Sequence, residues 1–299
     1  KRIWMQQGAN TTYVYYSLIR ATQPLKLTLK ALVNYRDYHG DTQAKDWQMS
    51  LSEADGGLVI NAFPGAVPFY LRSDSGAITS THEWNYGFDL AVERYRGLSD
   101  REDHLHVATF EATLNAGQSL TFVASTESHN DLNGEMALRS QQDYEQRLIQ
   151  CSTPEPDKPL PDWIAQLVLA ADQFIVNRST PNEPNGKTII AGYHWFGDWG
   201  RDTMISLPGL TLATGRAEIA SSILRTFARY IDQGMLPNRF PDAGERPEYN
   251  TVDATLWYFE AIRVYYRATQ DHDLLQKLFP ALADIIAWHC RGTRYNIRV

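Results

Sequence analysis

The hydrophobic pattern of this chain changes its period once, near Gln141, and this change constrains the fold more than any other feature. Before it, short segments rich in β-branched and aromatic residues alternate with turn sequences, which is typical of strands. We expect strands at 13–18, 25–29, 67–71 and 120–124. Regular short strands with no helical pattern between them predict an antiparallel β-sandwich.

After Gln141, apolar residues recur at helical spacing. A polar connecting helix is predicted over 142–150, and four prolines between 154 and 161 mark a linker. Further helices are then expected, in order, from 162 onward, over 205–213, over 219–234, over 251–268 and over 273–289. Asp162 is expected to cap the first of these. The fourth is apolar on nearly every side, which predicts a buried helix.

These patterns divide the chain into three parts. We expect a β-sandwich domain over 1–130, a connecting helix with a proline-rich linker over 131–161, and a helical domain over 162–299. The chain starts with Lys1, and the residues that follow it already have the pattern of a strand, so we expect it to begin inside a domain. The predicted fold class is therefore α+β and multidomain.

Composition narrows the classes of partner. The net charge is −7 and no block of like charge occurs, which argues against nucleic acid as the main partner and fits a neutral ligand. No segment approaches the roughly 18–20 apolar residues that a membrane span needs. There are two cysteines without metal-ligand spacing and no signal peptide, so we expect a cytoplasmic protein without a disulfide framework.

Two loop-to-helix junctions, residues 192–203 and 234–253, concentrate aromatic, acidic and basic side chains. Aromatic rings stack on the apolar face of a sugar, and Asp with Arg can hold its hydroxyl groups. If the two helices point the same way, Asp202 and Asp253 face a common site. We therefore expect a carbohydrate ligand at these junctions.

Glycoside hydrolysis needs one carboxyl group that donates a proton and a second that activates water or attacks the sugar. Asp253 lies one helical turn before Trp257 in an apolar segment, and apolar surroundings raise the pKa of a carboxyl group, as a general acid requires. Asp202 follows Arg201, and an ionised carboxylate suits binding of hydroxyl groups.

Simpler roles remain open for the same residues. Asp202 and Asp253 can each act only as a helix cap, and Trp195 and Trp199 can fill a core. His194 is expected to be a hydrogen-bonded loop histidine, because no second ligand stands at metal spacing. The polar residues 36–39 either reach the site or form a buried cluster that pins a strand end, and the cluster is the simpler expectation.

Several segments resemble known sequences. Residues 193–196 (Tyr-His-Trp-Phe), 199–203 (Trp-Gly-Arg-Asp-Thr), 236–240 (Leu-Pro-Asn-Arg-Phe) and 249–254 (Tyr-Asn-Thr-Val-Asp-Ala) resemble the C-terminal glucosidase domain of glycogen debranching enzymes. Residues 35–39 (Tyr-Arg-Asp-Tyr-His) resemble the N-terminal sandwich domain of the prokaryotic form. The resemblance implies an antiparallel sandwich followed by part of an (α/α)6 barrel. It also implies an inverting amylo-α-1,6-glucosidase reaction that removes single α-1,6-linked glucose units from limit dextrin.

The resemblance also implies roles for particular residues. Asp253 matches the proposed general acid, and Arg201 with Asp202 matches the pair that grips the terminal glucose. Three further residues fall in segments that line such sites: Trp195, Trp199 and Asn250. The implied partners are glycogen, limit dextrin or a malto-oligosaccharide, and neither a cofactor nor a metal ion is expected.

The chain also departs from the family pattern. A full barrel has twelve helices, whereas four or five are predicted here, and the family's general base is a glutamate far downstream of the Asp253 segment. Glu245, Glu248 and Glu260 lack the matching context. We therefore expect a fragment whose general base lies beyond residue 299 and which is inactive alone. Two alternatives stay open: a related (α/α)6 α-glucosidase of glucoamylase or trehalase type, and a non-catalytic glycan-binding module.

Overall fold

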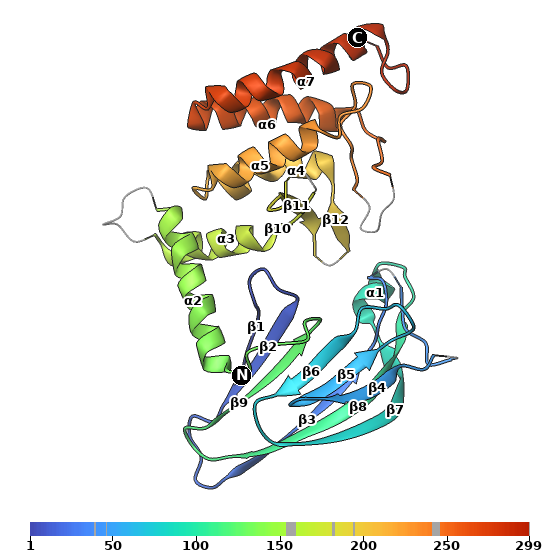
Figure 1. The fold of residues 1–299 in the computed structure, drawn as a ribbon, viewed down its shortest axis with the longest axis vertical. Coiled ribbons are helices and arrows are strands. Elements are labelled where there is room, and N and C mark those ends of the chain that lie inside the picture. Colours follow the sequence, from blue (N-terminus) through green and yellow to red (C-terminus); the bar gives the residue numbers. More distant parts are fainter. Residues whose placement is uncertain are drawn as a thin grey trace. The chain divides into compact units, whose positions relative to one another are not determined.

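The computed structural model describes residues 1–38, 40–45, 47–153, 160–180, 183–193, 195–240 and 246–298. The chain forms two compact units, Lys1–Asp143 and Tyr144–Val299 (Figure 1), and helix α2 (Gly134–Cys151) spans the division. Four features named from the sequence lie outside the described residues: His39, His194, Glu245 and most of the proline-rich linker. Within the described ranges, no helix is long and apolar enough to cross a membrane.

The first unit consists of two antiparallel sheets and the short helix α1 (Ala91–Tyr95). In spatial order, the six-stranded sheet contains β1 (Arg2–Met5), β2 (Thr11–Ser17), β9 (Ser119–Ser125), β6 (Phe69–Ser73), β5 (Gly57–Asn61) and β4 (Ser50–Ala54). The three-stranded sheet contains β3 (Leu25–Val33), β8 (Arg101–Leu114) and β7 (Ala77–Asp89). The antiparallel sheets predicted for the first half are confirmed, and each predicted strand overlaps an observed one.

One apolar core holds the two sheets together. Leu105 of β8 and Ile60 of β5 belong to different sheets, are fully buried and share a single cluster. The rings of Phe110 in β8 and Phe122 in β9 meet edge to face, with centroids 4.9 Å apart. Burying each large apolar side chain contributes about 1.5–3 kcal/mol, so this shared core is what packs the sheets face to face.

Polar residues after β3 gather around one buried carboxylate. Glu102 of β8 is 1% exposed, and its carboxylate accepts hydrogen bonds from the Asn34 side chain at 2.8 Å and from the Thr42 backbone N–H at 3.2 Å. The Arg36 guanidinium pairs with the same carboxylate. Buried charges need such partners. The structure therefore favours the expectation that Arg36 helps to pin a strand end.

The second unit combines helices with one small antiparallel sheet. Its helices after α2 are α3 (Asp162–Gln173), α4 (Gly200–Leu207), the π-helical turn η1 (Pro208–Leu212), α5 (Ala217–Ala228), α6 (Asp253–Thr269) and α7 (His272–Arg291). The sheet has the order β10 (Ile175–Asn177), β11 (Lys187–Gly192) and β12 (Phe196–Asp198). The sheet was not predicted.

The core of the second unit lies between α4, α5, α6 and α7. Leu207, Ile223 and Tyr258 are completely buried in it. The Tyr258 hydroxyl donates to the Leu224 carbonyl at 2.8 Å, so the one polar atom of this ring is satisfied, and burial raises its pKa. This packing positions the first turns of α4 and α6.

Several helix boundaries differ from the prediction. Helix α2 begins at Gly134 rather than at 142, because the Asn133 side chain caps it by accepting from the Met136 N–H at 3.0 Å. Helix α5 ends at Ala228 rather than at 234, and the chain then turns back on itself at 232–235. The N-cap of α3 is Pro161 and Asp162 is the first residue of the helix itself, so the predicted role of Asp162 as cap is wrong.

Two further differences concern α4 and α6. The helix expected over 205–213 starts earlier, at Gly200, and changes to a π-helical turn at Pro208, which has no N–H for a regular helical bond. Helix α6 is buried on one face only. Its Leu256 is 59% exposed, so the prediction of a helix buried on all sides is wrong.

Candidate carbohydrate site

Two helix N-termini in the second unit lie beside each other. Helix α4 packs against α6, and Arg201 Nη1 in the first turn of α4 lies 3.4 Å from Asp253 Oδ2, in the first residue of α6. Both side chains are a little under half exposed, at 43% and 44%. A pair this exposed contributes only about 0–1 kcal/mol. A polar ligand can therefore displace Asp253 from Arg201 at little cost.

The segment 235–240 links the two helices. The carbonyl of Asn238 accepts from the Gly200 N–H at 2.8 Å, and the Leu236 N–H donates to the Thr255 hydroxyl of α6 at 2.8 Å. Trp199 pairs with Arg239 across an isolated antiparallel bridge, which extends the strand direction of β12. The two junctions identified in the sequence thus share one small ladder of hydrogen bonds.

Gly200 allows this close approach. A Cβ atom at this position would lie 2.1 Å from the Pro237 carbonyl oxygen, whereas ordinary contacts begin near 3.4 Å. A side chain here would push α4 away from the linking segment. The glycine therefore sets the distance between the first turn of α4 and residues 237–238.

Neither aspartate caps its helix. The N-cap of α4 is Trp199 and that of α6 is Val252, and neither makes a side-chain capping bond. Asp202 and Asp253 lie inside the first turns, where a carboxylate is stabilised by the helix dipole. The simpler interpretation of both residues as caps is contradicted.

The surroundings of Asp253 differ from the expected apolar walls. Its carboxylate contacts the Arg201 guanidinium, and the nearby Trp257 is itself 39% exposed. The ligand-free arrangement therefore holds the Asp253 carboxylate in an ion pair, and a role as proton donor requires Arg201 to find another partner.

The remaining predicted residues lie in the same two junctions as this pair. Asn250 is exposed and accepts from the Asn238 side-chain amide at 2.9 Å, so it is tied to the ladder. Trp199 is half-buried, and its ring meets that of Phe196 edge to face, with centroids 6.4 Å apart. Asp202 shares the first turn with Arg201, and Trp195 is half-buried beside β12.

Sequence reasoning missed Asp198 and Asn238. Asp198 ends β12, is 1% exposed and pairs with Arg178 Nη2 at 2.5 Å. Burial raises the pKa of Asp198, although the Arg178 charge opposes this. Arg178 also lies over the Phe240 ring, 5.6 Å from its centroid. The signal for Asp198 was its place in the aromatic run just before Trp199, but nothing in the sequence identified Arg178 as its partner.

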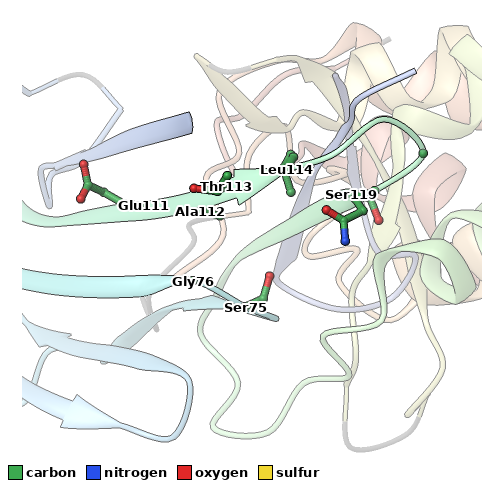
Figure 2. A pocket seen from close by; sticks show the side chains of 9 residues that line it. Ser75, Gly76, Glu111, Ala112, Thr113, Leu114 and Ser119 are labelled. Carbon is green, nitrogen blue, oxygen red and sulfur yellow. The ribbon is translucent and has the colours of Figure 1, made fainter. Parts of the chain in front are cut away.

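A cavity of about 580 Å³ lies in the first unit, away from these residues in the chain (Figure 2). It is lined by Ser75, Gly76, residues 111–114 and residues 117–119, with no aromatic ring among them. The Glu111 carboxylate is already engaged by Lys26 at 2.8 Å and by Thr28 at 3.2 Å. Without an aromatic platform, this cavity is a poor sugar site. Within the described ranges, no cluster of three or more His, Cys, Asp or Glu residues could hold a metal ion.

Comparison with known proteins matches both units. A family model described as the N-terminal domain of glycogen debranching enzyme matches residues 1–121, and one described as amylo-alpha-1,6-glucosidase matches residues 169–299. The chain belongs to the glycogen debranching enzyme family. A glycogen debranching enzyme of Saccharomyces cerevisiae is 40% identical over 73 residues, which is 24% of this chain and 5% of the yeast protein.

Two solved structures are similar over nearly the whole chain. A bacterial glucoamylase in complex with acarbose has a TM-score of 0.45 and 14% identity, over 95% of this chain and 45% of the other. A protein from the human microbiome named as a candidate kojibiose phosphorylase has a TM-score of 0.42 and 13% identity, over 96% of this chain and 42% of the other. The chain spans less than half the length of each of these three proteins.

Proposed function

We propose that this chain forms part of a glycoside hydrolase that acts on glycogen-type carbohydrate and removes α-1,6-linked glucose from limit dextrin with inversion. The observation that carries the proposal is the meeting of Arg201 and Asp253 at the first turns of α4 and α6. Both residues lie in the part of the chain matched by the amylo-alpha-1,6-glucosidase model. We further propose that α3 to α7 belong to an (α/α)6 barrel.

The proposed roles follow from the chemistry of the side chains. The planar guanidinium of Arg201 can hold two hydroxyl oxygens at once, and Asp202 can accept from hydroxyl hydrogens. When the terminal glucose takes over the Arg201 contacts, the Asp253 carboxyl group is released from the ion pair and is free to donate its proton to the glycosidic oxygen. Trp195, Trp199 and Asn250 are proposed to line the same site.

Inverting hydrolysis also needs a general base. Of the nearby glutamates in the described ranges, Glu248 pairs with Arg239 at 3.0 Å and Glu260 pairs with Arg263 at 2.5 Å. Each of these carboxylates is already engaged in an ion pair, so it is not free to activate a water molecule. Neither glutamate is therefore proposed as the base.

The test is the Asp253→Asn variant in the full-length protein. Glucose release from limit dextrin should fall by about 10²- to 10⁴-fold, the usual contribution of general acid–base catalysis, while dextrin binding persists. The matched control is Asp273→Asn, since Asp273 is an exposed aspartate in the first turn of α7. This control should leave turnover unchanged.

Three results would count against the proposal. Unchanged turnover in Asp253→Asn would remove Asp253 from catalysis. Cleavage of maltose or trehalose with limit dextrin inert would assign the protein to the related α-glucosidases. Dextrin binding by the unmodified protein without release of any glucose would favour a glycan-binding module.

A further inference from the structure

Asn238 is a buried polar residue whose side chain and backbone both form hydrogen bonds to the first turn of α4. It is 2% exposed, and its side-chain amide bonds in two directions. Its Oδ1 accepts from the Arg201 backbone N–H at 3.3 Å, and its Nδ2 donates to the Asn250 side-chain oxygen at 2.9 Å. Its backbone accepts from Gly200 at 2.8 Å and donates to the Glu248 carbonyl at 2.8 Å.

Helix α4 has no cap of its own. The first backbone N–H groups of any helix lack partners within that helix, and a polar side chain just before the helix normally supplies one. The residue in that position is Trp199, which makes no capping bond. Asn238, which lies 37 positions downstream of Arg201, supplies acceptors to both Gly200 and Arg201 instead.

We propose that Asn238 is a positioning residue, which caps α4 from a separate segment and so holds Arg201 in reach of Asp253 and of the ligand. The segment that carries Asn238 is also bonded to α6, through the Leu236 N–H and the Thr255 hydroxyl at 2.8 Å. One short segment therefore sets both helix ends. The inference rests on the proposed function only in naming a carbohydrate as the ligand.

The chemistry of the amide explains why asparagine is needed here. The Arg201 N–H requires an acceptor, and the Asn250 side-chain oxygen requires a donor. An amide supplies both on adjacent atoms, whereas a carboxylate supplies acceptors only. Asn238→Asp should therefore keep the bond to α4 and can keep a bond to Asn250 only if the Asn250 amide turns over to donate, whereas Asn238→Ala should lose both.

The experiment measures backbone amide exchange and ligand binding in the same variants. Hydrogen exchange of the Arg201 N–H should be about 2- to 30-fold faster in Asn238→Ala, which corresponds to the stability usually lost when a helix cap is removed. In Asn238→Asp the exchange rate should stay close to that of the unmodified protein. The matched control is Thr226→Ala, because Thr226 is 3% exposed and bonds within α5 to Ser222 at 3.0 Å. It should leave the Arg201 exchange unchanged.

The binding arm uses isomaltose, an α-1,6-linked glucose disaccharide, titrated into the full-length protein. Its Kd should rise about tenfold or more in Asn238→Ala and stay unchanged in Thr226→Ala. Unchanged exchange at Arg201 in Asn238→Ala, or an equal rise throughout the unit in both variants, would overturn the positioning role. Failure of the unmodified protein to bind isomaltose would instead count against the proposed function, while the exchange arm still decides the role of Asn238.

Discussion

Replacing Gly200 with alanine sets two physical effects against each other. Gly200 is the first residue of α4, and alanine is favoured over glycine in a helix by about 1 kcal/mol. Helix propensity alone therefore predicts that Gly200→Ala stabilises the protein. The structure predicts the opposite, because the new Cβ would lie 2.1 Å from the Pro237 carbonyl oxygen.

The size of the effect follows from the contacts. Relieving the overlap requires the backbones to separate by more than about 1 Å, and overpacking of this kind costs about 1–3 kcal/mol. The separation also weakens the Gly200 N–H bond to the Asn238 carbonyl, now 2.8 Å, which contributes about 0.5–1.5 kcal/mol. After the gain in propensity is subtracted, Gly200→Ala should destabilise the second unit by about 1–3 kcal/mol.

Urea unfolding of the two variants Gly200→Ala and Gly209→Ala measures this difference. Gly209 lies in the adjacent π-helical turn, and a Cβ there meets no atom within 4 Å. Gly209→Ala should therefore stabilise the protein by about 0.4–1 kcal/mol. Isomaltose binding should weaken in Gly200→Ala alone. Equal stability of both variants, with unchanged binding, would refute the close approach between α4 and residues 237–238.

Two further predictions concern other parts of the chain. Backbone N–H groups of Ala44 and Gly87 donate to the Asp103 carboxylate and hold its pKa below the ordinary value. The contribution of Asp103 to stability is therefore complete above the pKa of the unfolded chain, near pH 4. It is lost as the pH falls through the lower pKa of the folded state. Thermal melts from pH 2 to 7 should show a smaller loss on acidification in Asp103→Asn than in the unmodified protein, and parallel curves would contradict this. Cys151 and Cys290 are free and exposed, so two thiols per chain should react with a thiol reagent under native conditions, and a count below two would show that one is protected.

Alternation and helical periodicity were enough to predict the antiparallel first half and the helical second half. The small sheet β10-β11-β12 escaped because β10 and β12 are three residues long, too short to show alternation. The change of α4 into a π-helical turn depends on Pro208, whose position the sequence shows but whose local consequence it does not. Hydrophobic periodicity also does not show a boundary that a single hydrogen bond sets, such as the cap from Asn133 to α2.

The candidate site was predictable as two segments but not as a set of contacts. The density of aromatic and charged residues marked both junctions, and Arg201 and Asp253 do meet. The partner of Asp253 could not be anticipated, because its sequence neighbours are apolar whereas its contact comes from another helix. Asn238 gave no signal of its own, since its role depends on the missing cap at Trp199.

Arg201 is held by two contacts that differ in their exposure to water: one to its backbone and one to its side chain. The bonds that place the Arg201 backbone involve Asn238, which is nearly fully buried, so they exchange poorly with water. The bond that the Arg201 side chain makes to Asp253 is a little under half exposed, so water and ligand hydroxyls compete for it. The backbone of Arg201 is fixed while its guanidinium can change partners, as a binding residue requires. The ligand can therefore replace Asp253 without a change in the position of α4. The same exchange would release the Asp253 carboxylate from Arg201 and leave it free to contact the ligand.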